Sequence, residues 1–234
     1  MAHSGSSGSS WTLRLGIGAV AAFVIGPLLA HFSIVPPRIG FVIFDLGGLL
    51  GVIAAVVGII GALRGRASWG AVAPGAVVAA AFLGLAVNAA KYPPINDITT
   101  DLDEPPVFTS AKNAPGNAGR DLRYPGSSFA EQQRAAYPKI VNLLLPLSPD
   151  EAYRRVLSAA RTMPDWEIVS TDDSGKWLDG AATSWLFRFQ DDFVIEVRPQ
   201  DNGSQVRMRS KSRDGKSDLG ANAKRIEEFF AKLR

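Results

Sequence analysis

Three long apolar runs occupy the first ninety residues of this 234-residue chain and constrain what it can fold into. They extend over residues 15–35, 39–63 and 71–90. Each contains about twenty residues or more, which at about 1.5 Å rise per residue crosses a hydrocarbon core about 30 Å thick. We therefore expect a bundle of three transmembrane helices within residues 11–91, followed by a polar domain from Tyr92 onward.

The segment before the first run is rich in Gly and Ser, so residues 1–10 are predicted to be a disordered leader. The first run is longer than the apolar region of a signal peptide, and no small-x-small cleavage site follows it. Because two more runs come after it, we interpret the first run as a retained helix.

The distribution of charged residues also changes at the boundary between the apolar runs and the polar domain. In the first 91 positions the only acid is Asp45, and the five basic residues lie at the ends of the apolar runs: Arg14, Arg38, Arg64, Arg66 and Lys91. This leaves 20 of the 25 basic and 21 of the 22 acidic residues for the rest of the chain, a net charge of −1. The pI of about 9.3 therefore does not describe a basic soluble domain, and nucleic acid is not an expected partner.

The distribution of charge also predicts an orientation. With a cytoplasmic N-terminus, Arg14, Arg64 and Arg66 lie inside and only Arg38 and Lys91 lie outside. Residues 92–111 contain four acids and no Lys or Arg, which is typical of a translocated segment. We expect a multi-pass protein of the cytoplasmic (inner) membrane whose C-terminal domain is periplasmic.

Asp45 and Asn88 are polar residues within the second and third apolar runs, and Asp45 is the one acid among the three runs. A charge at the bilayer centre costs about 2.5 to 3.5 kcal/mol on insertion scales. Asp45 is therefore either a relay or a contact to a partner subunit, or an acid near the outer membrane face that is solvated or protonated, since its run begins only at Ile39.

Small residues recur at four-residue spacing in two of the runs. Gly47 and Gly51 form one pair, and Ala80, Gly84 and Asn88 repeat the spacing in the third run. Such faces allow helices to approach closely. The sequence leaves open whether they pack within the three-helix bundle or against another membrane protein.

Several chemistries are excluded by composition. The chain has no Cys, and its two His residues, His3 and His31, both precede the soluble domain. Disulfides, thiolate catalysis, imidazole-dependent triads and histidine metal centres are therefore not available to that domain. We expect no cofactor, no metal and no catalytic residues, although carboxylate, lysine or tyrosine chemistry remains possible.

The soluble part begins with a Pro-rich stretch, so residues 92–127 are predicted to form an extended strap and a mobile loop. The domain proper is expected over residues 128–234. Ser128 and Glu131 form one capping-box motif and Ser148 and Glu151 another, each predicting a helix start. A last amphipathic helix is expected over 217–234, with Leu219 on its apolar side.

Patterns typical of β-strands occupy the segments between these predicted helices. Alternation and β-branched or aromatic residues predict strands at 139–146, 166–171, 176–184, 185–190, 193–198 and 205–213. Asn202-Gly203 predicts a type I′ turn that places Glu196 opposite Arg209 and a bulge near Pro199. The expected fold is α+β, a curved antiparallel sheet of about four to six strands covered by two main helices.

One predicted strand carries basic residues at alternate positions, all on one face: Arg207, Arg209, Lys211 and Arg213. With Lys216 they form a candidate patch for an anion or a partner. The alternative is a solvated face paired with acids such as Glu196 and Asp218.

The sequences INDITTD at 95–101, Tyr137-Pro138 and RSKSRDGKSDLGANAKR at 209–225 resemble the family known as domain of unknown function 1499. The resemblance covers residues 92–234 and not the three runs. It implies a domain boundary and fold more than an activity. The positions it marks are Asp97, Thr99, Thr100, Arg209, Ser210, Ser212, Arg213, Gly215, Asp218, Gly220, Asn222 and Arg225.

The spacing of Asp218, Asn222 and Arg225 is close to one helical face, which suggests a structural motif that locks the last strand to the last helix and holds segment 95–101. Asp101 is included in this motif. The leading hypothesis is a non-catalytic accessory or assembly subunit of a membrane protein complex, with lipids and other membrane proteins as partners. A module that binds lipid or another apolar ligand is the alternative, and a carboxylate-dependent hydrolase ranks lowest.

Overall fold

The computed structural model describes residues 5–234, with side chains from residue 8 onward. The chain forms two compact units. One consists of residues 1–91 together with Trp185–Arg188, and the other of Tyr92–Ser184 together with Phe189–Arg234.

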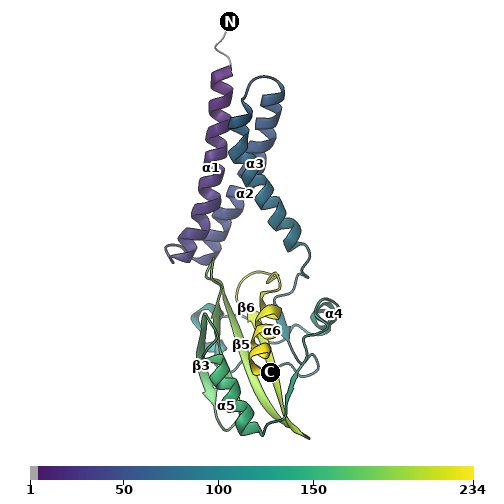
Figure 1. Cartoon of the computed structure of the whole chain (residues 1–234). Helices are drawn as coiled ribbons and strands as arrows, with labels where there is room; N and C mark the ends of the chain where they lie inside the picture. The colour runs from purple at the N-terminus through teal and green to yellow at the C-terminus, as the bar shows by residue number, and fades with distance from the viewer. Residues whose placement is uncertain (1–4) are drawn as a thin grey trace. The chain divides into compact units, whose positions relative to one another are not determined.

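The first unit contains three helices, α1 (Gly5–His31), α2 (Pro37–Leu63) and α3 (Trp69–Ala89) (Figure 1). Each is long and apolar enough to cross a membrane, with spans of 24, 27 and 21 residues. The three apolar helices predicted from the sequence are therefore confirmed.

Two glycines of α2 determine how closely the helices pack. A Cβ atom on Gly47 would lie 2.4 Å from the backbone nitrogen of Phe23 on α1. A Cβ on Gly51 would lie 2.5 Å from a methyl group of Val78 on α3. The Gly47 and Gly51 pair thus packs within the bundle, where any larger residue would separate the helices.

Residues 5–10, predicted from the sequence as part of a disordered leader, belong to α1. The hydroxyl of Thr12 donates to the carbonyl of Gly8 at 3.0 Å, and Ser9 accepts from the backbone N–H of Ser68 at 2.9 Å. These bonds hold a stretch whose Gly and Ser content alone favours disorder. Residues 1–4 lie outside the described part of the chain.

The second unit is an α+β domain built on one antiparallel sheet of six strands, in the order β1-β6-β5-β4-β3, with β2 pairing beside β1 on the same edge of β6. The strands are β1 (Asp97–Thr99), β2 (Leu143–Leu145), β3 (Trp166–Asp172), β4 (Trp177–Thr183), β5 (Gln190–Gln200) and β6 (Gly203–Ser212). The helices are α4 (Ser127–Ala136), α5 (Pro149–Ala160) and α6 (Ala221–Leu233), with short 3₁₀ turns at Ala111–Asn113 and Pro115–Asn117. This confirms the predicted fold class.

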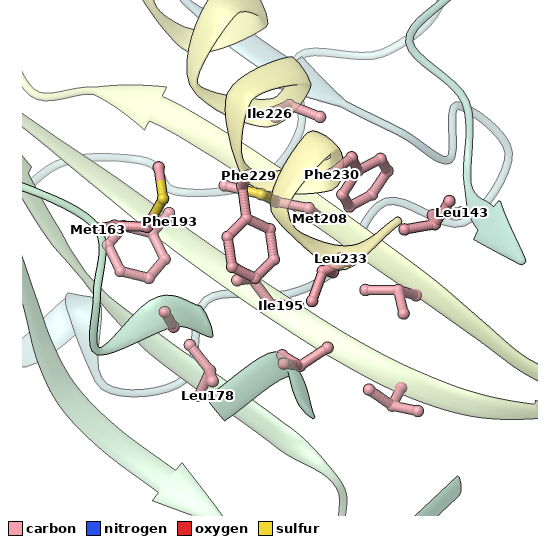
Figure 2. Packing of buried hydrophobic residues seen from close by; sticks show 14 of the residues in the cluster. Leu143, Met163, Leu178, Phe193, Ile195, Met208, Ile226, Phe229, Phe230 and Leu233 are labelled. Atoms are coloured by element: carbon pink, nitrogen blue, oxygen red, sulfur yellow. The ribbon is translucent and has the colours of Figure 1, made fainter. Parts of the chain in front are cut away.

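The hydrophobic core fills the space between one face of the sheet and helices α5 and α6 (Figure 2). Phe193 and Met208 from the strands meet Phe229 from α6, and all three are fully buried. Trp166 packs its ring on Phe193 and Phe229 at centroid distances of 4.1 and 5.2 Å. Alternation along β5 and β6 sends every second side chain into this core.

The hairpin of β5 and β6 differs from the prediction. Gln200 pairs with Gly203, so the turn residues are Asp201 and Asn202, one position earlier than predicted. Glu196 therefore faces Arg207 rather than Arg209. Pairing continues without interruption through Pro199, and the irregularity of the sheet lies instead in β3, between Ile168 and Ser170.

Residues 185–190 were wrongly predicted as a strand, and all but Gln190 lie in the loop between β4 and β5. The alternation of Trp185, Phe187 and Phe189 is real, but these rings do not belong to the sheet's core. Arg188 has a φ of 63°, a left-handed conformation that a strand cannot contain.

Helix boundaries also differ. The capping box at Ser148 and Glu151 is present and confirms the start of α5. The one predicted at Ser128 is absent, because α4 begins at Ser127 after Gly126. Helix α6 begins only at Ala221, after Gly220 in a left-handed conformation, so Leu219 precedes the helix and is exposed.

Candidate functional site

The most unusual feature of the domain is a layer of charge on the face of the sheet opposite α5 and α6. Arg207, Arg209 and Lys211 alternate along β6, Arg213 directly follows the strand, and all four point to this face. Residues 100–124, here called the strap, cover them. Arg207 and Arg209 are each only 2% exposed, so the basic residues form an internal layer, not a solvated surface.

Asp97 of β1 lies at the centre of this layer. Its carboxylate accepts Nε and Nη2 of Arg209 at 2.8 and 2.7 Å and Nζ of Lys211 at 2.8 Å. Asp97 is fully buried, and a bidentate pair with a planar guanidinium is the strongest common form of ion pair. One acid thus holds two basic residues of β6.

Arg209 also fixes the strap. It donates to the carbonyl of Pro106 at 3.1 Å and to that of Leu122 at 2.9 Å. Its guanidinium lies between the rings of Phe108 and Tyr124, 4.7 and 5.5 Å from their centroids. Burial, with the negative charge of Asp97, raises the pKa of Tyr124 to about 12, so this phenol stays protonated.

A second acid, Asp192 of β5, binds the other end of the layer. It accepts Nε and Nη2 of Arg213 at 3.0 and 2.7 Å and the side-chain amide of Asn117 at 2.8 Å. Arg120 of the strap lies 3.9 Å from the same carboxylate and donates to the carbonyl of Ser212 at 2.7 Å. Strap and sheet are therefore joined at both ends by buried charged groups.

Arg207 faces three acids. Its Nε lies 3.2 Å from Asp101, and its Nη1 lies 3.7 Å from both Glu104 and Glu196. Burial alone would raise the pKa of the Asp101 carboxyl. Hydrogen bonds from the Glu104 amide and the Asn142 side chain, together with the charge of Arg207, outweigh this and lower the pKa below its usual value.

The other face of β6 is joined to α6 by polar groups. Ser210 donates to Oδ1 of Asn222 at 2.7 Å, and Nδ2 of Asn222 donates to Ser212 at 3.0 Å. Arg225 donates to Ser210 at 2.9 Å and pairs with Asp191 at 2.6 Å. Helix α6 is thereby tied to both β5 and β6.

Asp218 caps the start of α6. It accepts the backbone N–H of Gly220 at 2.9 Å and that of Asn222 at 3.0 Å. Burial raises the pKa of Asp218 despite these two bonds. Gly220 is needed here because Tyr92 packs on its Cα, where a Cβ would lie 2.5 Å from the ring.

Of the remaining residues named from the sequence, Thr99, Thr100 and Gly215 form hydrogen bonds within the domain, and Lys216 does not take part in the charged layer. Backbone groups of Thr99 exchange bonds of 3.0 and 2.6 Å with the side chain of Gln133. Thr100 donates to Asn142 at 2.7 Å, and the Gly215 carbonyl accepts from Asn96. Lys216 is exposed and forms no ion pair within the described part of the chain.

Sequence reasoning missed several buried acids and amides of the domain, only some of which belong to the charged layer. Asp179, Asp191 and Asp192 are buried, as are Gln133 and Asn117. Asp179 accepts backbone N–H groups of Thr109 and Ser110 at 3.1 and 2.8 Å. The adjacent acids 191 and 192 at the start of an apolar strand were an available signal, since buried carboxylates require partners.

The polar residues of the helical unit lie in different settings. Asp45 is half-buried within α2. Ala80, Gly84 and Asn88 are all exposed on α3, and a Cβ on Gly84 would meet no atom within 4 Å. This face is therefore not used in packing the bundle, unlike Gly47 and Gly51.

The buried acids of the charged layer are paired, whereas Nε of Arg207 and the hydroxyl of Tyr124 have no hydrogen-bond partner among the described residues. A surface cleft of about 560 Å³ lies along the strap, and Phe108, Lys112, Arg120 and Tyr124 are among its lining residues. The carboxylates of Asp97 and Asp192 face basic residues, so neither is placed as a general base. Among residues 5–234, no three His, Asp or Glu side chains are grouped to hold a metal ion.

Three helices of spanning length and an α+β domain with a buried charged layer define a membrane-anchored α+β protein. Residues 97–233 match the family described as "Protein of unknown function (DUF1499)", and the chain belongs to this family. The match covers the sheet, the strap and α6, and the three helices precede it. No curated protein matched the chain.

Proposed function

We propose that this protein is an accessory or assembly subunit of a membrane protein complex, and that its domain acts by binding and not by catalysis. The observation that carries the proposal is the outward face of α3. Ala80, Gly84 and Asn88 line this face, one helical turn apart. Glycine inside a helix costs about 1 kcal/mol relative to alanine, yet Gly84 relieves no contact within the chain.

A small-residue face with an amide near its end is the arrangement by which transmembrane helices associate. Asn88 lies in the last turn of α3 and is exposed in the isolated chain. A partner helix would cover Gly84 at short range and would offer Asn88 a hydrogen bond. This supports another membrane protein as the partner.

The domain supports a non-catalytic role. The charged residues of its family motif, among them Asp97, Arg209, Arg213 and Arg225, are committed to internal pairs. The space under α6 is occupied by Phe193, Met208 and Phe229, so no observation favours a lipid-holding cavity there. The charge pattern of the sequence supports an extracytoplasmic, periplasmic position for the domain.

The partner can be tested by purification in a mild detergent followed by mass spectrometry of the wild type, Gly84→Leu and Gly70→Leu. Both glycines lie on α3 with open space around them, so both variants keep the bundle. We expect a stoichiometric membrane protein with the wild type and Gly70→Leu, and a loss of at least fivefold with Gly84→Leu. Equal recovery with both variants, or no stoichiometric protein, would reject the proposal.

The side of the membrane on which the domain lies can be tested separately. Because the chain contains no cysteine, a single introduced cysteine can be labelled specifically. Val107 is 71% exposed on the domain, and a Val107→Cys variant offers one reactive thiol. A membrane-impermeant maleimide applied to cells with a permeabilised outer membrane should label it without lysis. Labelling only after lysis would place the domain in the cytoplasm.

A further inference from the structure

The loop between β4 and β5 is closed by two hydrogen bonds at its base and exposes apolar side chains. The backbone N–H of Ser184 donates to the carbonyl of Phe189 at 2.7 Å, and the N–H of Phe189 donates to the Ser184 hydroxyl at 2.9 Å. The four residues between them read Trp-Leu-Phe-Arg. Trp185 is 68% exposed and Leu186 38% exposed, so the loop presents two apolar side chains at its surface.

These four residues, here called the aromatic tip (Trp185–Arg188), belong to the compact unit of the three helices. Within that unit, Nδ1 of His31 lies 2.8 Å from the carbonyl oxygen of Trp185. The ring of Phe187 lies 5.2 Å from that of Phe41 and 5.5 Å from that of Phe44. The aromatic tip therefore packs against the end of α1 and the beginning of α2.

The distribution of tryptophan in this unit is uneven. Trp11 and Trp69 lie near the starts of α1 and α3, and both are exposed. The bond between Ser9 and Ser68 places these two starts at the same end of the bundle. At the opposite end the helices and their connection supply exposed Phe32 and Ile34 but no tryptophan. Among residues 5–234, Trp185 is the only tryptophan of this unit at that end.

Tryptophan concentrates at both membrane–water interfaces, where its ring is buried and its N–H is solvated. At the end of the bundle where α1 ends and α2 begins, Trp185 supplies the indole ring that the helices themselves do not. No acid lies between Thr183 and Gln190, and Arg188 makes no ion pair within the described residues. The aromatic tip thus combines apolar rings with a positive charge, as a phospholipid surface requires.

We propose that the aromatic tip is an interfacial membrane anchor. Trp185 and Leu186 enter the boundary between headgroups and acyl chains, and Arg188 faces lipid phosphate. The partner is the bilayer that holds the protein's own helices. In the sequence, strands β4 and β5 flank this anchor. The inference does not depend on the proposed accessory role.

Lipid quenching tests this inference in the full-length, cysteine-free chain. Leu186→Cys is labelled with a nitrobenzoxadiazole fluorophore and reconstituted in phosphatidylcholine–phosphatidylglycerol vesicles. Phe32→Cys serves as the control near the helix ends, and Val107→Cys as the control on the exposed strap. Quenchers are a lipid carrying a nitroxide near the top of its acyl chain and, separately, aqueous iodide.

We expect the label at 186 to be quenched by lipid nitroxide to at least half the extent of the label at 32, and to be protected from iodide relative to the label at 107. Adding Trp185→Ser should reduce the lipid quenching at least twofold. Quenching by iodide alone, or by neither quencher, would overturn the proposal, because the tip would then lie in water or be covered by protein. Circular dichroism checks that each variant is folded.

Discussion

Asp97 is a single buried carboxylate that binds Arg209 and Lys211 at once, and removing it leaves two buried charges without their counterion. Breaking a buried pair by removing one partner costs about 3 to 5 kcal/mol. We therefore expect Asp97→Asn to lower the free energy of unfolding of the domain by about this amount. Chemical denaturation of the protein in detergent, followed by near-UV circular dichroism, measures the change.

Asp103→Asn is the matched control, since Asp103 is an exposed acid of the same strap and forms no ion pair with the described residues. Its effect should stay within about 0.5 kcal/mol. If both variants unfold at the same denaturant concentration, Asp97 does not hold the layer together.

The pKa of Asp101 gives a pH-dependent prediction. Its folded pKa is lowered, so its contribution to stability is complete above the unfolded pKa of about 3.9 and is lost as the pH falls through the folded value. The melting temperature of Asp101→Asn should thus lie below that of the wild type at pH 7, and the difference should shrink below about pH 4. A difference independent of pH between 7 and 3 would contradict this assignment.

For individual residues, the sequence predicted which side chains share a face of the sheet but did not predict which segment covers that face. The alternation from Arg207 to Arg213 correctly placed four basic side chains together. Asp97 comes from a strand 112 residues away, Asp192 comes from the preceding strand of the hairpin, and the strap that buries the basic residues has no periodic pattern. Burial by an irregular segment leaves little local signal.

Among the secondary-structure elements, the two Ser-x-x-Glu motifs offer a direct comparison. The hydroxyl of Ser148 accepts the N–H of Glu151 and caps α5, whereas Ser128 caps nothing because α4 starts one residue earlier. Removing a serine cap costs about 1 kcal/mol. Ser148→Ala should lower the stability of the domain by this amount in thermal or chemical denaturation.

Ser128→Ala should change stability by less than about 0.5 kcal/mol in the same measurement. An equal loss in both variants would mean that the bonds of Ser148 add nothing beyond helix propensity. The comparison also shows why the motif alone is ambiguous: Gly126, with a φ of 93°, already serves as the N-cap of α4.

The alternation of apolar residues at 185–190 was also ambiguous as a sequence signal. Trp185, Phe187 and Phe189 have the period of a strand, but period alone does not say whether a sheet edge is available to them. The bonds of Ser184 to Phe189 close a loop instead. By contrast, the strands β3 to β6 and helix α5 follow their sequence patterns closely, since their apolar periods face one continuous core.

For the whole molecule, the domain should fold without the helices if it includes β1. A fragment of residues 92–234 keeps Asp97, the packing of Tyr92 on Gly220 and the complete sheet. We expect it to melt cooperatively by far-UV circular dichroism in mild detergent. A fragment of residues 101–234 lacks β1 and the counterion of Arg209, and it should show no cooperative transition.

Equal melting of the two fragments would show that β1 is dispensable and would move the domain boundary toward the C-terminus. The sequence predicted the split between helices and domain because hydropathy changes abruptly at Lys91. It did not predict that Trp185–Arg188 groups with the helices, since nothing local distinguishes that segment from a strand.

The pairing of β1 with β6 sets an order of events during synthesis. Asp97 leaves the ribosome soon after the third helix, but Arg209 follows 112 residues later. At about 5 to 20 residues per second, Asp97 waits roughly 6 to 20 s for its partner. The sheet cannot close until the β5–β6 hairpin has emerged, so a chain that stalls before β6 leaves its nascent domain unfinished beside the membrane and exposed to proteases.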